Sequence, residues 1–413
     1  MVNVLRETPE RRWSKRAMLL VLTVISVFGS LAVSADAYDQ AKQIHDRIAG
    51  VPPDATTLQA MRDQIELNGD PLTAALMATD NPAFYNVTLK NFVAPWTNRD
   101  HNVFVPLNDY TATVIGIVRD DVDFRNILFG DIIYVGTGVA AYSTTNNANY
   151  EALEAQAADL SDTGKLVQRT QSSVTGIPSN ATAGVLTTRA SSKAFFIDGT
   201  NRAMFRFTLV NHLCRDMEQV HDTSRAPDRI RQDVSRSPGG DARVFLNGCI
   251  GCHTGMDPMT QAFAYYNFQY DKATDPTADA GFLKYNAAGD VDPITGTRVV
   301  RKYFNNNTTF PYGYITLDDH WDNYWRAGQN AVLGWDSALP GSGDGAKSLG
   351  QELANTQAFA QCQVEKVFQN VCLRAPADAA DRAQVSAMTA DFQSGGYKLR
   401  KVFAESAVYC MGN

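Results

Sequence analysis

The sequence predicts a mainly α-helical fold, and three observations carry that prediction. A capping residue precedes a proline at the first helical position in Asp70-Pro71 and in Asn81-Pro82, which is typical of helix starts. Apolar residues follow each of these prolines at helical spacing. Short β-prone runs lie in a polar, turn-rich stretch over residues 273–346, where we expect a small irregular or β insert.

Helical spacing continues through the first half of the chain. The expected helices cover residues 110–118, 124–129, 150–160 and 201–214. Stretches rich in Ser, Thr, Asn and Gly over 143–149 and 172–182 predict loops that flank the third of these helices. A charged stretch then leads into Pro238-Gly239-Gly240, where we place a domain boundary. Residues 36–238 are therefore expected to form a mainly helical N-terminal domain.

The second domain, residues 239–413, is expected to be helical on both sides of the insert. Asp257-Pro258 predicts another helix start, with the helix running through Phe268. After the insert, residues 347–411 return to helical patterns, with helices at about 355–372, 378–393 and 398–411.

The pentapeptide Cys249-Ile250-Gly251-Cys252-His253 carries the strongest chemical signal. On a helical turn, thiols at this spacing lie on one face and can both form thioethers to the haem vinyl groups, while the adjoining imidazole turns to the iron. We therefore expect one covalently attached haem c, with Cys249 and Cys252 as attachment residues and His253 as the proximal iron ligand. The second domain is then an α-helical cytochrome c-like haem domain that contains the insert.

Three other interpretations of the pentapeptide are a thioredoxin-like dithiol, half of a zinc site, and chance. The sequence has no second Cys-x-x-Cys for zinc, and no thioredoxin-like βαβ pattern surrounds the pair, so haem is favoured.

An attached haem predicts export, because haem is joined to such a motif outside the cytoplasm. Residues 1–35 match a signal peptide: four basic residues over 11–16 precede an apolar stretch over 17–31, and small residues around Ala35 and Ala37 suit cleavage. The apolar stretch is long enough for an uncleaved membrane anchor, which stays the alternative. We expect the mature protein in the periplasm or on the outer-membrane or extracellular side of a Gram-negative bacterium.

The charge of the chain limits its partners. Residues 1–35 carry a net charge of +3, so their removal takes the formal net charge from −7 to −10. An acidic chain without a basic tract argues against nucleic acid and against an anionic lipid surface as partners. It suits a redox partner protein with a positive docking patch.

The remaining cysteines are Cys214, Cys362, Cys372 and Cys410, an even number that predicts two disulfides in an oxidising compartment. Cys362 and Cys372 lie about 15 Å apart along one expected helix, which removes that pairing unless the helix breaks. If the three C-terminal helices alternate in direction, the first and third end together. This favours Cys372–Cys410 and leaves Cys214 with Cys362.

The sixth iron ligand decides the class of function, because electron carriers usually hold two strong axial ligands and small-molecule sites leave one position open. His320, in an expected loop downstream of the motif, is our candidate for the distal ligand. Met256 and Met259 are too close to His253 to reach the opposite haem face, and we expect them near an exposed haem edge. The other candidates are Met204, His212, Met217, His221 and Met388.

Four stretches carry a family resemblance. They are Ala183 to Thr187, Cys249 to Pro258 with the residues up to Phe268, Gln357 to Phe368, and Gly395 to Arg400. These stretches resemble, in order, segments of the secreted planctomycete-type cytochromes, whose C-terminal halves consist of domains of unknown function. The resemblance covers roughly residues 180–413 and implies haem binding and electron transfer with no known substrate. The insert and the cysteines 214, 372 and 410 depart from the family pattern and indicate a proteobacterial branch.

Three functions are compatible with these patterns. The first is an exported monohaem c-type cytochrome that carries single electrons between periplasmic or outer-membrane redox partners; it is favoured because no catalytic triad, carboxylate pair or metal cluster has a recognisable spacing. The second is a haem-containing oxidoreductase, or its electron-accepting subunit, with an open distal site; the size of the first domain favours it. The third is a surface-assembly protein in which the haem is secondary.

Overall fold

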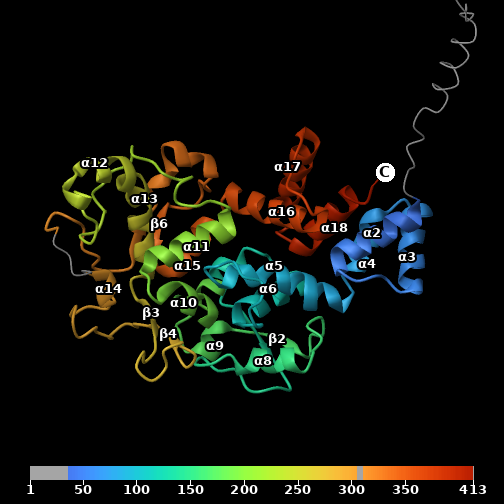
Figure 1. Ribbon diagram of the computed structural model, residues 1–413, viewed down its shortest axis with the longest axis horizontal. Coiled ribbons are helices and arrows are strands. Elements are labelled where there is room, and N and C mark those ends of the chain that lie inside the picture. The colour runs from blue at the N-terminus through green and yellow to red at the C-terminus, as the bar shows by residue number, and fades with distance from the viewer. Residues whose placement is uncertain (1–35, 305–309, 413) are drawn as a thin grey trace, which may run out of the picture.

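Helices dominate the computed structural model, which describes residues 36–304 and 310–412 (Figure 1). The prediction of a mainly α fold is therefore confirmed. The expected signal peptide, residues 1–35, lies outside the described residues.

The helices before residue 238 are α2 (Ala37–Ala49), α3 (Ala55–Glu66), α4 (Pro71–Ala78), α5 (Lys90–Val93), α6 (Asp109–Arg119), α7 (Asn126–Phe129), α8 (Ala148–Ala155), α9 (Gln171–Thr175), α10 (Arg189–Phe196) and α11 (Asn201–Leu213). Those after it are α12 (Ala242–Val244), α13 (Ile250–Thr260), α14 (Arg301–Phe304), α15 (Gly345–Ala354), α16 (Gln357–Cys372), α17 (Ala379–Ser394) and α18 (Leu399–Tyr409). The π-helical turns η1 (Phe84–Leu89) and η5 (Phe245–Cys249) lead into α5 and α13.

The strands of the described residues form two-stranded antiparallel sheets. They pair β1 (Ile133–Gly136) with β2 (Leu166–Arg169), β3 (Tyr266–Gln269) with β4 (Phe282–Tyr285), and β5 (His320–Asp322) with β6 (Ser342–Asp344). The last two sheets include strands from the expected insert, whose described residues are otherwise irregular apart from a few short helical turns.

Side-chain caps set the start of the helices at both predicted positions. Asp70 accepts a hydrogen bond from the backbone N–H of Thr73 at 3.0 Å, and Pro71 is the first residue of α4. Asn81 Oδ1 accepts from the backbone N–H of Ala83 at 2.9 Å. A side-chain cap of this kind stabilises a helix by about 1 kcal/mol.

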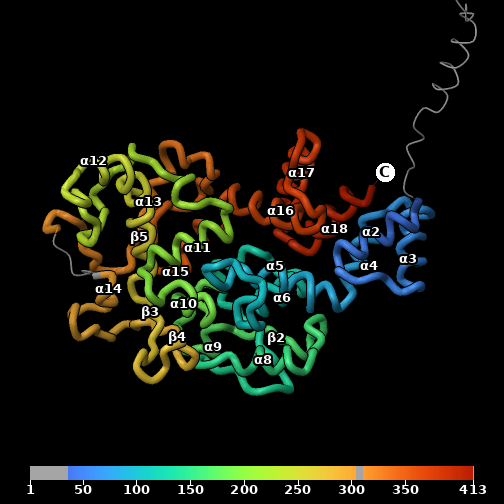
Figure 2. The backbone as a smooth tube through the Cα atoms, in the orientation of Figure 1, coloured from blue at the N-terminus to red at the C-terminus, as the bar shows by residue number. Residues whose placement is uncertain are grey.

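The C-terminal helices join the two ends of the molecule. α18 packs against α2, α4 and α16, and α16 packs against α11 and α17. In Figures 1 and 2, α16 and α18 run between the N-terminal helices at one end and the region of α11 and α13 at the other. The buried core includes Ile44 of α2, Phe205 of α11, Met259 of α13 and Phe403 of α18. Helices from both sides of residue 238 therefore contribute to one core.

The helix that contains the motif differs from the predicted one. Asp257-Pro258 does not start a helix, because α13 begins at Ile250 and contains Pro258. The chain then passes through a 3-10 turn into β3, so the prediction of a helix through Phe268 is wrong. The carboxylate of Asp257 is held by Arg202 and His253 instead of capping the backbone of a new helix.

Three further differences lie in the first half of the chain. Strands β1 and β2 were not predicted, and α9 occupies part of the expected loop at 172–182. Helix α8 ends at Ala155, earlier than expected, and Ala157 just beyond it has a left-handed φ of 47°.

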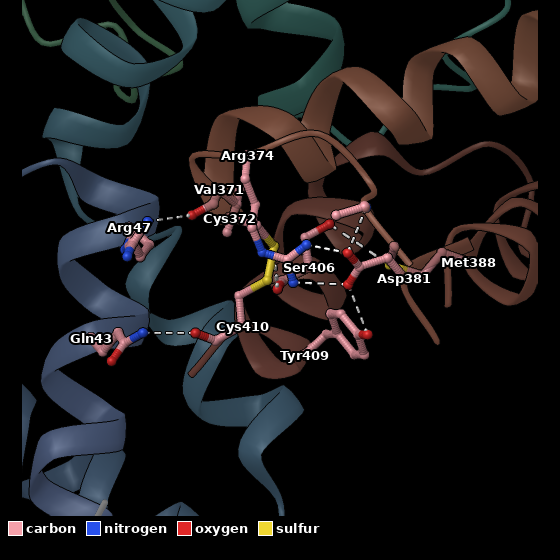
Figure 3. The surroundings of a disulfide bond; sticks show 11 residues. Gln43, Arg47, Val371, Cys372, Arg374, Asp381, Met388, Ser406, Tyr409 and Cys410 are labelled. Atoms are coloured by element: carbon pink, nitrogen blue, oxygen red, sulfur yellow. Dashed lines mark hydrogen bonds and ion pairs between the residues drawn. A yellow bond between two sulfur atoms is a disulfide. The ribbon is translucent and has the colours of Figure 1, made fainter. Parts of the chain in front are cut away.

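The disulfides match the predicted pairing. Cys214 is bonded to Cys362, with their Cα atoms 5.4 Å apart, and Cys372 is bonded to Cys410, with their Cα atoms 5.6 Å apart. Figure 3 shows that the second bond joins the ends of α16 and α18 beside α2. Gln43 of α2 donates to the backbone oxygen of Cys410 at 2.7 Å, which holds α2 beside the disulfide that joins α16 to α18.

Candidate functional site

The Cys-x-x-Cys-His motif lies where the π-helical turn η5 passes into α13. Cys249 ends the turn, and Cys252 and His253 follow in the first part of α13. Both thiols are free and partly buried, whereas the other four cysteines of the chain are in disulfides. The helical spacing places Cys249, Cys252 and His253 on neighbouring parts of one helix surface, as a doubly attached haem requires.

The imidazole of His253 is oriented by a carboxylate one helical turn away. Its Nδ1 lies 3.0 Å from Oδ1 of Asp257. An ionised carboxylate can only accept, so Nδ1 carries the proton and the lone pair of the neutral ring is on Nε2. Nε2 is therefore the nitrogen that can ligate a metal ion.

Asp257 is fully buried and belongs to a network of paired charges. Arg202 of α11 donates to both of its oxygens, from Nε at 2.7 Å and from Nη2 at 2.9 Å. The backbone N–H of Arg231 donates to Oδ2 at 3.1 Å. Burial disfavours the charged carboxylate, but the Arg202 guanidinium and the contact with His253 outweigh it and hold the pKa of Asp257 well below its usual range.

The network continues to a second carboxylate. Asp233 accepts from Arg202 at 2.7 and 2.9 Å and from Nη2 of Arg231 at 3.1 Å. Two arginines thus face two aspartates, and the group is formally neutral. Asn201 extends the network by accepting from Arg231 at 2.8 Å and donating to the backbone oxygen of Thr260 at 2.7 Å.

An apolar cluster separate from the main core borders the motif. Ile230, Val234 and Phe245 are buried together, and Cys249 and Ile250 pack against them. Two apolar side chains beside Phe245 remain exposed: Val244 is 49% exposed and Leu246 is 54% exposed. A porphyrin joined to the two thiols needs an apolar surface of this kind, so the residues present fit a covalently attached haem.

A haem iron takes its in-plane ligands from the porphyrin and needs only axial ligands from the chain. Within residues 36–304 and 310–412, no group of three or more His, Cys, Asp or Glu side chains could hold a metal ion.

His320 lies in strand β5, not in the expected loop. Its Nδ1 is 2.9 Å from Oδ1 of Asp344, its Nε2 is 3.7 Å from Oδ1 of Asp322, and the side chain is 45% exposed. Strand β5 packs against α13. The structure thus places His320 on a strand beside the motif helix but among carboxylates, and its role as distal ligand stays a prediction.

Two of the other candidates lie beside the motif. The backbone oxygen of Met217 is 3.4 Å from the sulfur of Cys252. The ring of His221 lies against Gly251, where a Cβ would come within 2.4 Å of the imidazole. The remaining candidates are buried elsewhere and have polar partners: His212 contacts the hydroxyl of Tyr110, Met204 that of Ser191, and Met388 that of Ser406.

Met256 and Met259 are buried in the main core, at 6% and 0% exposure. Both methionines therefore belong to the packing around α13, and the expectation that they lie near an exposed haem edge stays a prediction. The exposed apolar residues in the segment that leads into the motif are Val244 and Leu246.

A cavity that is lined mostly by residues from the first half of the chain lies apart from the motif. It has a volume of about 750 Å³ and is lined by residues that include Asp109, Tyr142, Tyr150, Arg189 and Lys193. The three motif residues do not line it.

The residues that sequence reasoning missed are Arg202, Arg231, Asp233 and the role of Asp257. One local signal was present: Asp257 is four residues after His253, which is the spacing of side-chain neighbours on a helix. The two arginines and Asp233 had no local signal, because their contacts with the site are made by tertiary packing.

Comparison of the chain with protein-family models, curated proteins and solved structures finds no match. The resemblance to the planctomycete-type cytochromes therefore stays a prediction. Among the described helices, none has the length and apolar character needed to cross a membrane.

Proposed function

We propose that the protein is an exported monohaem c-type cytochrome that carries single electrons between redox partner proteins, in the periplasm or on the outer-membrane or extracellular side of a Gram-negative bacterium. The observation that carries the proposal is the combination of two free thiols with a histidine whose Nδ1 is already bound. Cys249 and Cys252 are the free thiols of a chain whose other cysteines are paired. His253 presents Nε2 because Asp257 holds Nδ1.

Each part of the site has a role under this proposal. Cys249 and Cys252 would form thioethers, and His253 would be the proximal ligand. A bound haem would supply one-electron chemistry at the iron. Ile230, Val234 and Phe245 would cover apolar ring surface, and the exposed Val244 and Leu246 lie where a partner protein could approach.

The proposal is tested by export of the full chain in a bacterium that attaches haem c. The mature protein should retain haem after denaturation and gain the mass of one haem. The Cys249→Ala, Cys252→Ala double variant should retain none. A matched control changes two exposed residues of the preceding turn, Asn247→Ala and Gly248→Ala, and should keep the haem. A wild-type chain exported without covalent haem in such a host would overturn the proposal.

A second function, a haem-containing oxidoreductase or its electron-accepting subunit, is favoured by one observation. Both ring nitrogens of His320 lie beside carboxylates, Nδ1 beside Asp344 and Nε2 beside Asp322. In this arrangement His320 does not supply a distal iron ligand. Absorption and magnetic circular dichroism spectra separate the two functions. The electron carrier should be six-coordinate and low-spin in both oxidation states and should not bind carbon monoxide. A high-spin ferric form together with carbon monoxide binding would assign the oxidoreductase.

A further inference from the structure

The environment of Asp257 suggests more than a structural ion pair. Its Oδ1 receives both the ring N–H of His253 and Nε of Arg202. Its Oδ2 receives Nη2 of Arg202 and the backbone N–H of Arg231. Every partner is a donor, so the position of the carboxylate, and with it the plane of the imidazole, is fixed from several directions.

The acceptor at Nδ1 also affects how strongly Nε2 donates to a metal ion. A carboxylate pulls the Nδ1 proton more strongly than a backbone carbonyl does, so it makes the ring more basic. A more basic axial ligand stabilises the ferric state relative to the ferrous state and lowers the reduction potential.

On the basis of the proposed function, we propose that Asp257 is a positioning residue that fixes the Nδ1–H tautomer of His253 and lowers the reduction potential of the haem. Arg202 holds the carboxylate of Asp257 in place and limits the decrease in potential. Arg202 is shared between Asp257 and Asp233, with contacts of 2.7 to 2.9 Å to each. The positive charge of Arg202 partly cancels the negative charge of Asp257 at His253. The iron–histidine bond is thereby linked to α11, the helix that carries Arg202.

The test compares two variants that remove the same charge from the same network. Asp257→Asn removes the carboxylate that contacts His253. Asp233→Asn removes the carboxylate on the other side of Arg202, which accepts from Arg202 and Arg231. The readout is the midpoint potential of the haem-loaded protein in a spectroscopic redox titration.

Asp257→Asn should shift the ratio of ferric to ferrous protein, at a fixed applied potential, roughly tenfold toward the ferrous form, in the range of second-shell effects. For a one-electron couple this is a rise of about 59 mV. Asp233→Asn should give a clearly smaller rise. If both variants shift the potential equally, the effect is one of net charge and the proposal is overturned; an unchanged potential in Asp257→Asn overturns it as well.

A second measurement covers the case in which Asp257→Asn fails to fold, because removing one member of a buried charge pair can be strongly destabilising. In the ferrous wild-type protein, NMR should detect one ring N–H of His253, at Nδ1, that exchanges slowly with solvent. Fast exchange of this proton would contradict the proposal. Absence of haem from the wild-type protein would instead refute the proposed function, so the two failures are distinguishable.

Discussion

Removal of the disulfide between Cys372 and Cys410 is expected to lower the free energy of unfolding by ~4 kcal/mol. The bond spans 38 residues, and the chain-entropy relation for closing a loop of that length gives this value at 25 °C. The bond between Cys214 and Cys362 spans 148 residues, and the same relation gives ~5 kcal/mol. The relation therefore also ranks the two double variants: Cys214→Ala, Cys362→Ala should be less stable than Cys372→Ala, Cys410→Ala by about 1 kcal/mol.

Urea unfolding of the wild-type protein and the two double variants, all in the same haem state, measures these differences. Dithiothreitol should destabilise the wild-type protein more than either double variant, because each variant retains a single reducible bond. Labelling of the denatured, unreduced protein should find no free thiol at these four positions. An unfolding midpoint of Cys372→Ala, Cys410→Ala equal to that of the wild type would refute the loop-entropy reasoning.

Three other predictions follow from the site and the core. His253→Ala should leave the haem covalently attached but alter its ferric spin state and lower the melting temperature, and an unchanged spectrum would contradict a proximal role. Gly255→Ala should lower the free energy of unfolding in urea by about 1–3 kcal/mol, because its Cβ would lie 1.8 Å from Nε1 of Trp325. Gly248→Ala is the control and should be neutral, since nothing lies within 4 Å of its Cβ. Equal losses in the two variants would rule out the clash. Burial and the neighbouring carboxylate of Asp391 raise the pKa of Glu405 to about 7, so the contribution of Glu405 to stability should fall as pH rises from about 4.5 to 7. The stability gained by Glu405→Gln should therefore grow over that range. A gain independent of pH would refute this assignment.

Helices with local start signals were predictable from the sequence. α4 begins at the proline after Asp70, and α17 covers Ala379–Ser394 where 378–393 was expected. The caps and apolar spacing that define such helices lie within a few residues of one another, so no tertiary information is needed. The same local geometry made the pairing of Cys372 with Cys410 accessible, since it required only the lengths and alternating directions of three helices.

The parts that sequence reasoning missed depend on distant partners. An Asp before a Pro commonly caps a helix, but Asp257 is paired with Arg202, which is 55 residues earlier. Strand β5, which contains His320, pairs with β6, and Asp344 of β6 lies opposite His320. This pairing joins residues that are distant in sequence, so the local pattern around His320 predicted a loop. The thiols and the proximal histidine could be identified from their spacing, whereas the charges that surround them could not.

The contacts between α2 and the last helix have a consequence for the order of folding. Side chains of α2 donate to the backbone oxygens of Val371, Cys410 and Gly412. Under the proposed export, a chain threaded from its N-terminus delivers α2 together with its neighbours α3 and α4, whereas the acceptors at Val371, Cys410 and Gly412 arrive last. Pairings of such long sequence separation are slow to form. Under the proposed function, residues 249–253 would be exported before these acceptors, which leaves time for haem attachment before the two ends of the chain pair.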